Sequence, residues 1–260
     1  MKNTKAQVTT FIIIAVFIIA IAIGITFLKS NKQTDQVGTI MSKLGLEAQA
    51  TVVENSIQDC LEETSENGIA VVGLQGGYYN KPEDSNKYYD MEWTFIPYYY
   101  DQGSFQQPST SQIESEISAY VDENIETCLN QLEYNNFNLA FGTSNSNSQI
   151  KETKVEIQTD LTISISKDER TETLNLKNSP TEIVSPLFRI LEVATFITES
   201  HREDPEMLCV SCVADMAEER NIYVDMTSFE DDPGSTLTII SENQTFSDTY
   251  VFEFLNRYPE

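Results

Sequence analysis

Residues 155–165, VEIQTDLTISI, decide the fold class of this chain. Their apolar residues alternate with polar ones, at Val155, Ile157, Leu161, Ile163 and Ile165. A period of two predicts a strand with one buried face and one face in water. Residues 167–170 predict a turn, and residues 171–176 predict the returning strand of a hairpin. The centre of the chain is therefore expected to form antiparallel sheet, in which one face is commonly solvated.

Helices are predicted on both sides of this hairpin. Their expected ranges are residues 39–66, 111–135, 180–200 and 205–219. The first two show apolar residues at spacings of three and four, and Gly45 weakens the first without ending it. Ser179 and Glu182 have the spacing of a capping box, with Pro180 at the first helical position. These signals predict where the third helix begins.

Further strands and a domain division follow from the rest of the chain. Strands are expected over residues 69–79, 91–100, 221–228, 235–242 and 248–255. Because strands and helices come in separate runs, we predict an α+β fold of antiparallel sheet packed with amphipathic helices. The low-complexity run GTSNSNSQ, residues 142–149, predicts a loop between two subdomains. The predicted parts are a leader (1–6), a transmembrane helix (7–30), a linker and helix (31–66), a Tyr-rich α/β subdomain (67–141) and a C-terminal α+β subdomain (150–260).

The composition indicates an acidic, globular protein. The chain has 260 residues, of which 40% are hydrophobic, so it can bury a core. Its 41 acidic and 16 basic residues give a formal net charge of -25. A surface of that sign repels nucleic acid and the headgroups of anionic lipids. We therefore expect no nucleic-acid partner and a domain that stands off the membrane surface.

Residues 8–28, VTTFIIIAVFIIAIAIGITFL, contain no charged residue. As a helix they would be about 31 Å long, which matches the hydrocarbon core of a bilayer. A cleaved secretory signal has an apolar core of only about 7–15 residues, followed by a small-residue cleavage site. The prediction is a single retained transmembrane helix, in contact with membrane lipid through residues 8–28, in a protein of the cell membrane.

Lys5, Ala6 and Gln7 immediately precede the apolar stretch. The run KAQVTTFIIIAVFIIAIAIG resembles the class III signal of archaeal type IV pilin-like proteins, and the start of similar archaeal single-span surface proteins. The resemblance implies that a prepilin peptidase cuts between Ala6 and Gln7 on the cytoplasmic side, and that the helix stays on the mature protein. The fifth mature residue is Phe11, where bacterial pilins carry Glu. The alternative is an uncleaved anchor that has Lys-Ala before it.

The cysteines and a glycosylation acceptor favour an extracytoplasmic C-terminal domain. Lysines flank the apolar stretch on both sides and do not decide its orientation. Asn243 begins the acceptor Asn-Gln-Thr, and disulfides belong to oxidising compartments. Cys60, Cys128, Cys209 and Cys212 predict two disulfides with three possible pairings. Cys60 and Cys128 share the helical pattern I-x-x-C-L, which favours pairing them with each other.

The motif Cys209-Val210-Ser211-Cys212 has three interpretations, of which a local disulfide is favoured. A redox motif needs its first cysteine at a helix N-terminus. The predicted helix start at Pro205 instead puts Cys209 in the second turn, among acidic residues that oppose a thiolate. A zinc site would take His201 as its third ligand, but it lacks the second pair of ligands that a closed site needs. We predict no metal site and no cofactor.

Aromatic residues crowd between positions 78 and 100. The candidate binding residues among them are Tyr78, Tyr79, Trp93, Tyr98, Tyr99 and Tyr100. Such a patch suits stacking on sugars or contact with a neighbouring subunit, since tyrosine offers large contact area at low entropic cost. The alternative is a half-exposed sheet with tyrosine on both faces. His201 is the only histidine and no catalytic arrangement forms around it, so the chain is not expected to be an enzyme.

The sequence therefore leaves two main functions open. The first is an extracytoplasmic pilin-like subunit or minor pilin with an acidic display domain, whose partners are like subunits or other surface proteins. The second is a monomeric anchored binding module for adhesion, or for glycan or protein recognition, that uses the Tyr-rich face. An exterior enzyme ranks last.

Overall fold

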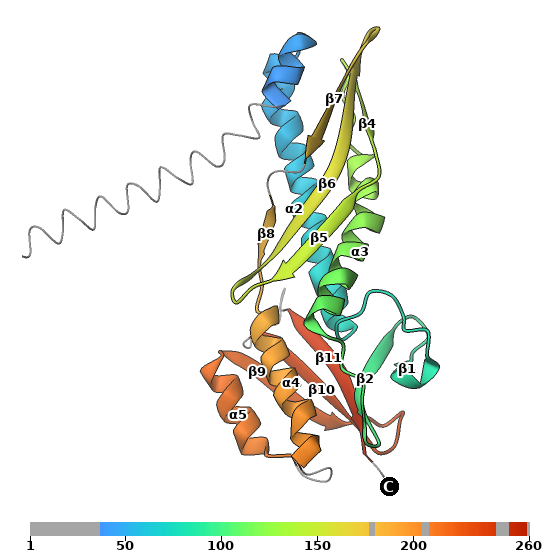
Figure 1. Cartoon of the computed structure of the whole chain (residues 1–260), viewed down its shortest axis with the longest axis vertical. Helices are drawn as coiled ribbons and strands as arrows, with labels where there is room; N and C mark the ends of the chain where they lie inside the picture. Colours follow the sequence, from blue (N-terminus) through green and yellow to red (C-terminus); the bar gives the residue numbers. More distant parts are fainter. Residues whose placement is uncertain (1–36, 177–179, 204–207, 243–249, 259–260) are drawn as a thin grey trace, which may run out of the picture.

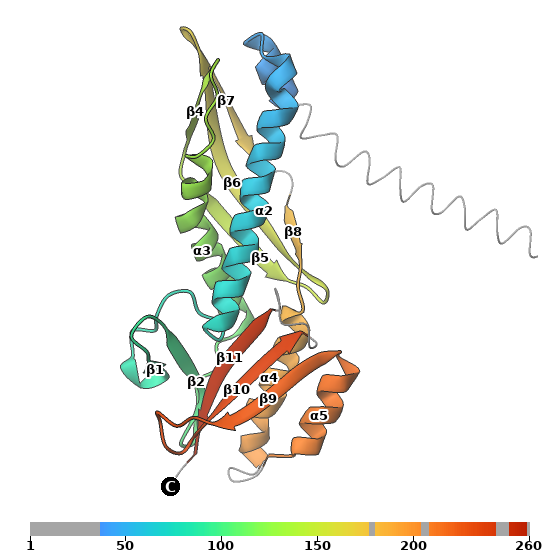
Figure 2. The same ribbon diagram turned by 180° about the vertical axis from the view of Figure 1, so that it is seen from behind.

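The computed structural model of the chain describes residues 37–176, 180–203, 208–242 and 250–258. The molecule is elongated, with two helices and one sheet along its length and a second sheet with two further helices at one end (Figures 1 and 2). Within the described ranges, every strand pair except one is antiparallel. The predicted α+β class is confirmed, whereas the transmembrane helix predicted with it lies outside the described residues.

The long helix α2, Ala50–Leu74, differs from the prediction at both ends. Residues 37–43 form a separate helical segment, a turn with Gly45 at φ +66° follows it, and η1, Glu47–Gln49, leads into α2. The helix then continues through residues 69–74, which the sequence predicts as strand. Gly68 does not stop the helix, and a Cβ there would lie only 2.7 Å from the ring of Tyr120. This glycine instead lets the neighbouring helix approach closely.

That neighbour is α3, Thr110–Leu129, and its prediction is confirmed apart from its ends. Ser109 is the N-cap, since its hydroxyl accepts from the backbone N–H of Gln112 at 3.2 Å. The buried residues of α3 recur every four positions and so lie on one helix face: Ile113, Ile117, Val121, Ile125 and Leu129. α3 therefore packs along α2 with the apolar stripe that the sequence predicts.

The first sheet is built around β6, Lys154–Lys167. The strands β4 (Asn138–Phe141), β5 (Asn145–Ile150), β7 (Arg170–Leu176) and β8 (Thr181–Val184) all pair with β6 in the antiparallel sense. The hairpin of β6 and β7 confirms the prediction for residues 155–176. The predicted loop at 142–149 is wrong, because β5 occupies most of it.

Polar side chains of α3 explain why so polar a segment forms β5. The backbone N–H of Ser146 donates to Asp122 Oδ2 at 3.1 Å, and that of Ile150 donates to Glu114 Oε1 at 2.8 Å. These carboxylates bond N–H groups of the outer edge of the strand. A strand that pairs with side chains on one edge needs no apolar alternation.

The second sheet lies at the opposite end of the molecule from the helical residues 37–43 (Figure 1). Its order is β1 (Tyr88–Asp90), β2 (Phe95–Asp101), β11 (Val251–Arg257), β10 (Ser235–Glu242) and β9 (Ile222–Ser228), with β3 (Ser104–Phe105) beside β2 and η2 (Ser85–Lys87) before β1. The strands predicted at 91–100 and in the C-terminal region are confirmed to within a few residues. β2 and β11 pair in parallel, so the predicted subdomains 67–141 and 150–260 share one sheet and are not separate units.

Two helices cover one face of the second sheet, α4 (Leu187–Glu203) and α5 (Val210–Glu219). The sequence predicts that the third helix begins at Pro180. This prediction is wrong, because Thr181–Val184 pairs with β6 as strand β8. α4 begins after Ser185 and Pro186, where the backbone N–H of Leu187 donates to the Ser185 hydroxyl at 3.2 Å. The Ser-Pro signal that starts this helix thus occurs twice in the sequence, and the second copy is used.

Two main clusters of buried side chains follow the long axis of the molecule. One cluster includes Met41, Val53, Leu129 and Leu161, and joins the start of the described chain to α2, α3 and β6. The other includes Tyr99, Ile117, Leu187 and Phe252, and joins α3 and α4 to the second sheet. The core therefore crosses the predicted subdomain boundary, which explains why the described chain forms one elongated body.

Candidate functional site

Several predicted site residues lie outside the described part of the chain. They are the processing residues Lys5, Ala6 and Gln7, the apolar residues 8–28 and the glycosylation acceptor Asn243. In the ranges that are described, no helix combines the length and the apolar character that crossing a bilayer requires. Processing, anchoring and glycosylation therefore stay predictions.

β2 buries the tyrosines that the sequence assigns to a binding face. Tyr98, Tyr99 and Tyr100 are 4%, 0% and 1% exposed. The Tyr99 hydroxyl donates to the carbonyl of Gly76 at 3.0 Å, and its ring stacks on Phe254 with 4.3 Å between centroids. Burial raises the pKa of the Tyr99 hydroxyl well above its usual value. A buried ring is not available to a ligand, so the prediction of binding is wrong for these three residues.

The Tyr98 hydroxyl belongs to a cluster of charges that ties the second sheet together. It donates to Asp232 Oδ2 at 2.7 Å, and the guanidinium of Arg257 lies 4.5 Å from the centre of its ring. Burial first, and then the bond to Asp232, raise the pKa of Tyr98. Arg257 also binds Asp101 through two bonds of 2.7 and 2.9 Å, a bidentate geometry. These contacts join β2, β11 and the turn before β10, which is a structural role.

The remaining residues of the predicted Tyr-rich face are divided between core and surface. Tyr78 is buried, and Tyr79 is half-buried with its hydroxyl donating to Glu123 at 2.9 Å. Trp93 is 89% exposed. Of the six predicted binding residues, only Trp93 and part of Tyr79 reach solvent. The six candidate binding residues therefore do not form one exposed face.

The start of the described chain is fastened to the turn between β6 and β7. Lys167 Nζ donates to the carbonyl of Leu44 at 3.1 Å, at the C-terminal end of the helical residues 37–43. A cation is favourable there because the last carbonyls of a helix carry partial negative charge. Lys43 Nζ lies 3.2 Å from Glu172 Oε2 in β7. Sequence analysis missed these contacts, since each joins residues that only the fold brings together.

Cys60 of α2 and Cys128 of α3 form a disulfide with their Cα atoms 5.7 Å apart. This is the pairing that the shared I-x-x-C-L pattern favours. Cys60 is 2% exposed and Cys128 is half-buried, so the bond lies in the interface between the two helices. A buried disulfide between two long helices is typical of proteins of oxidising compartments.

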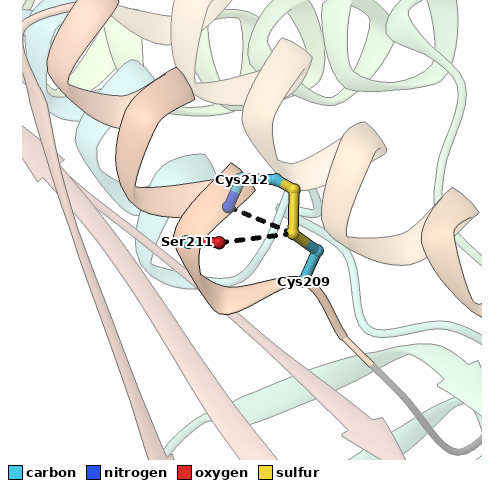
Figure 3. Close-up of a disulfide and its surroundings, with 3 residues drawn as sticks. All are labelled: Cys209, Ser211 and Cys212. Carbon is cyan, nitrogen blue, oxygen red and sulfur yellow. Dashed lines mark hydrogen bonds between the residues drawn. A yellow bond between two sulfur atoms is a disulfide. The ribbon is translucent and has the colours of Figure 1, made fainter.

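The second disulfide joins Cys209 and Cys212, and both residues are exposed (Figure 3). α5 begins at Val210, so Cys209 is its N-cap. The sequence prediction, which puts Cys209 in the second turn of the helix, is wrong. The backbone N–H of Cys212 donates to Cys209 Sγ at 3.3 Å, and the Ser211 hydroxyl lies 3.6 Å from the same sulfur. The first cysteine therefore occupies the helix N-terminus that a redox motif requires.

The three candidate zinc ligands do not form a metal site. The sulfurs of Cys209 and Cys212 are bonded to each other. His201 is 2% exposed, stacks on Tyr100 with 4.9 Å between ring centroids, and has Nε2 3.2 Å from the Tyr258 hydroxyl. Over the described ranges, no three His, Cys, Asp or Glu residues are grouped so that they could hold a metal ion.

An apolar groove of about 570 Å³ lies between α5 and β9, and is called the α5–β9 groove below. Two elements line it. α5 contributes Val210, Val213, Ala214, Ala217 and Glu218, and β9 contributes Ile222, Tyr223, Val224 and Met226. Val210 is 68% exposed and Tyr223 is 47% exposed. β9 is the last strand of its sheet among the described strands. Sequence analysis missed the groove, because an exposed valine has no signature before the fold is known.

Three features of the described chain thus bear on function: its fastened start, its two disulfides and the α5–β9 groove. The contacts of the chain's start and the α5–β9 groove depend on distant segments that the fold brings together. The sequence predicts the two disulfides. Comparison of the chain with known protein families, with curated proteins and with solved structures found no match.

Proposed function

We propose that this protein is a membrane-anchored surface protein with an extracytoplasmic acidic domain, a pilin-like subunit or minor pilin. The observation that carries the proposal is the position of the helical residues 37–43, the dark blue start of the described chain, which lie at one end of the elongated domain (Figure 1). The apolar residues 8–28 precede this end by only a few residues. An anchor at that point would place the second sheet furthest from the membrane.

The short connection limits how far the domain stands from the bilayer. Residues 29–36 can span at most about 28 Å even if fully extended. The end of the domain that carries the β6–β7 turn would therefore face the membrane, and α4 and α5 would face outward. The acidic surface suits this arrangement, since it is repelled by anionic headgroups.

The contacts at the start of the described chain support a rigid connection between anchor and domain. Lys167 and Glu172 hold the segment that contains Lys43 and Leu44, and Met41 of the same segment is fully buried. A pull on the anchor would reach β6 and β7 through these contacts. The Cys60–Cys128 disulfide then joins α2 to α3 covalently.

The alternative binding module relied on the Tyr-rich face, and the burial of Tyr98, Tyr99 and Tyr100 removes most of that face. The pilin-like proposal does not depend on those residues. It depends on the N-terminal resemblance, the apolar stretch and the position of the helical residues 37–43.

The test is the intact mass of the native protein purified from its own membranes. A chain that begins at Gln7 is expected, and a chain that retains residues 1–6 contradicts the pilin-like route. Lys5→Gln changes the residue pair before the proposed cut and is expected to block removal of the leader. Lys2→Gln removes the same charge three residues earlier and is the matched control, which is expected to be processed normally.

The same mass measurement tests the compartment. Reduction under denaturing conditions is expected to add about 4 Da, two for each of two disulfides, and no gain in mass contradicts an extracytoplasmic domain.

A further inference from the structure

The exposed Cys209–Cys212 disulfide is poorly explained as a stabilising bond. It closes a loop with a sequence separation of 3, whereas the Cys60–Cys128 bond has a separation of 68. In the chain-entropy model a disulfide stabilises less the shorter the loop that it closes, so this bond stabilises the fold much less than the Cys60–Cys128 bond does. We propose that Cys209–Cys212 is a redox-active disulfide, which oxidises the thiols of a polypeptide bound in the α5–β9 groove.

The N-terminus of α5 favours a thiolate on Cys209. The Cys212 backbone N–H and the Ser211 hydroxyl both lie within hydrogen-bonding reach of Cys209 Sγ (Figure 3). The helix has ten residues, and its N-terminal end carries partial positive charge. A stabilised thiolate is a good leaving group, and it makes the corresponding disulfide more oxidising. The acidic residues at 203, 204 and 206, which oppose this effect, are not among the residues whose side chains are described.

The groove next to the motif determines what kind of thiol would react. Val210 lies between the two cysteines and also lines the α5–β9 groove. β9, as an edge strand, offers backbone groups to an extended chain, and the groove offers apolar side chains. Glu218 adds negative charge to the wall of the groove. The occupant that fits is an extended, cysteine-containing segment with apolar side chains and a flanking lysine or arginine.

The reaction balances without a further reagent in a single turnover. A thiolate of the bound polypeptide attacks Cys209 Sγ, the Cys209–Cys212 bond breaks, and Cys212 leaves as a thiolate that takes up a proton. A second thiolate of the polypeptide then attacks the polypeptide sulfur that is bonded to Cys209 in the mixed disulfide. This forms the disulfide of the polypeptide and releases Cys209 as a thiolate. The polypeptide loses two electrons, the motif gains them, and the second proton goes to solvent.

The first experiment uses the full chain in nonionic detergent and the reduced synthetic peptide KVCVTVCK as probe. The protein is expected to oxidise about one equivalent of peptide per chain. Alkylation and mass analysis should then find Cys209 and Cys212 as thiols and the Cys60–Cys128 bond intact. A peptide that stays reduced overturns the proposal.

Two single variants distinguish a redox motif from a bond that is merely exposed. Each is mixed at pH 6 with the same peptide in its disulfide form. Cys212→Ser is expected to form a mixed disulfide through Cys209 at least about tenfold faster than Cys209→Ser forms one through Cys212, because only Cys209 has the stabilised thiolate. Equal rates overturn the role given to the helix N-terminus.

A third variant tests the polypeptide in the groove. Val210→Asn is expected to slow the reaction with KVCVTVCK about tenfold and to leave the reaction with reduced glutathione unchanged. Val184→Asn is the matched control, because Val184 is 89% exposed on β8, and it should change neither rate. An unchanged peptide rate in Val210→Asn overturns the groove as the binding surface. These results do not depend on the N-terminal residue, so they can fail while the pilin-like proposal stands, and the reverse also holds.

Discussion

A single glycine after α2 fixes the path of the chain toward the second sheet. Gly76 has φ +54°, and a Cβ there would lie 2.4 Å from the carbonyl oxygen of Glu253 and 2.5 Å from Pro97 Cγ. Gly103 has φ +99°, with nothing within 4 Å of its Cβ position. Alanine at Gly103 therefore adds backbone strain alone, whereas alanine at Gly76 adds strain and a clash with β11.

We expect Gly103→Ala to lower the free energy of unfolding by about 1–2 kcal/mol. Gly76→Ala should lower it by about 2 kcal/mol more, because overpacking against a backbone carbonyl is added. Urea unfolding of the intact chain in nonionic detergent measures both values. Equal losses in the two variants would contradict the close contact between the turn and β11.

The residue scale also explains why the sequence does not decide between an exposed and a buried position for these tyrosines. β2 is buried at every position except the last, so it lacks the alternation that distinguishes an inner from an outer face. A hydroxyl group also gives no reliable sign of exposure. The hydroxyls of Tyr98 and Tyr99 are bonded to Asp232 and to the Gly76 carbonyl, partners that are remote in sequence. Sequence reasoning finds the strand but not its surroundings.

Among the helices, the interface between α2 and α3 depends on the Cys60–Cys128 bond. Replacing both cysteines by alanine is expected to lower the free energy of unfolding by about 4 kcal/mol, as the chain-entropy model gives for so long a loop. Replacing Cys209 and Cys212 by serine should cost at most about 2 kcal/mol, the value that the same model gives for the short loop. Calorimetry on the two double variants measures the difference. A larger loss from the short loop would contradict this ranking.

The elements that were predicted correctly are those with a strong local pattern. β6 alternates cleanly, the buried face of α3 has helical spacing, and the Cys60–Cys128 pairing follows from two matching helix patterns. The errors have tertiary causes. At Gly68 the glycine lets α3 pack closely against α2 and does not end the helix, and in β5 carboxylates of α3 bond the edge of a polar segment. No window of local sequence contains these partners.

At the scale of the whole molecule, the fold class was predictable and the division into subdomains was not. β2 pairs with β11, which joins residues near 98 to residues near 255. A contact over that separation has no signature in composition or periodicity. The cysteine motif is local, so the sequence predicts its disulfide. The α5–β9 groove beside it forms only when β9 is in place, so the sequence does not predict it.

The charge of the whole chain predicts that salt stabilises it at neutral pH. The chain has 41 acidic and 16 basic residues, so repulsion between carboxylates outweighs the attraction within ion pairs such as Arg257–Asp101. Raising NaCl from 20 to 500 mM shortens the Debye length from about 20 to about 4 Å and screens this repulsion. Tm should rise by several degrees, since about 1 kcal/mol corresponds to roughly 2–4 °C in a chain of this size.

The control for this salt effect is the same calorimetric scan at pH 4.2, the isoelectric point that the sequence gives. The net charge is close to zero there, so the attractive pairs are what salt screens, and Tm should no longer rise. A Tm that falls with salt at pH 7 would mean that ion pairs such as Lys154 with Glu156 and Glu182 outweigh the repulsion. The surface charge would then act as a network that holds the domain together, and the acidic excess would need an origin other than the solubility and lipid repulsion of an exterior domain.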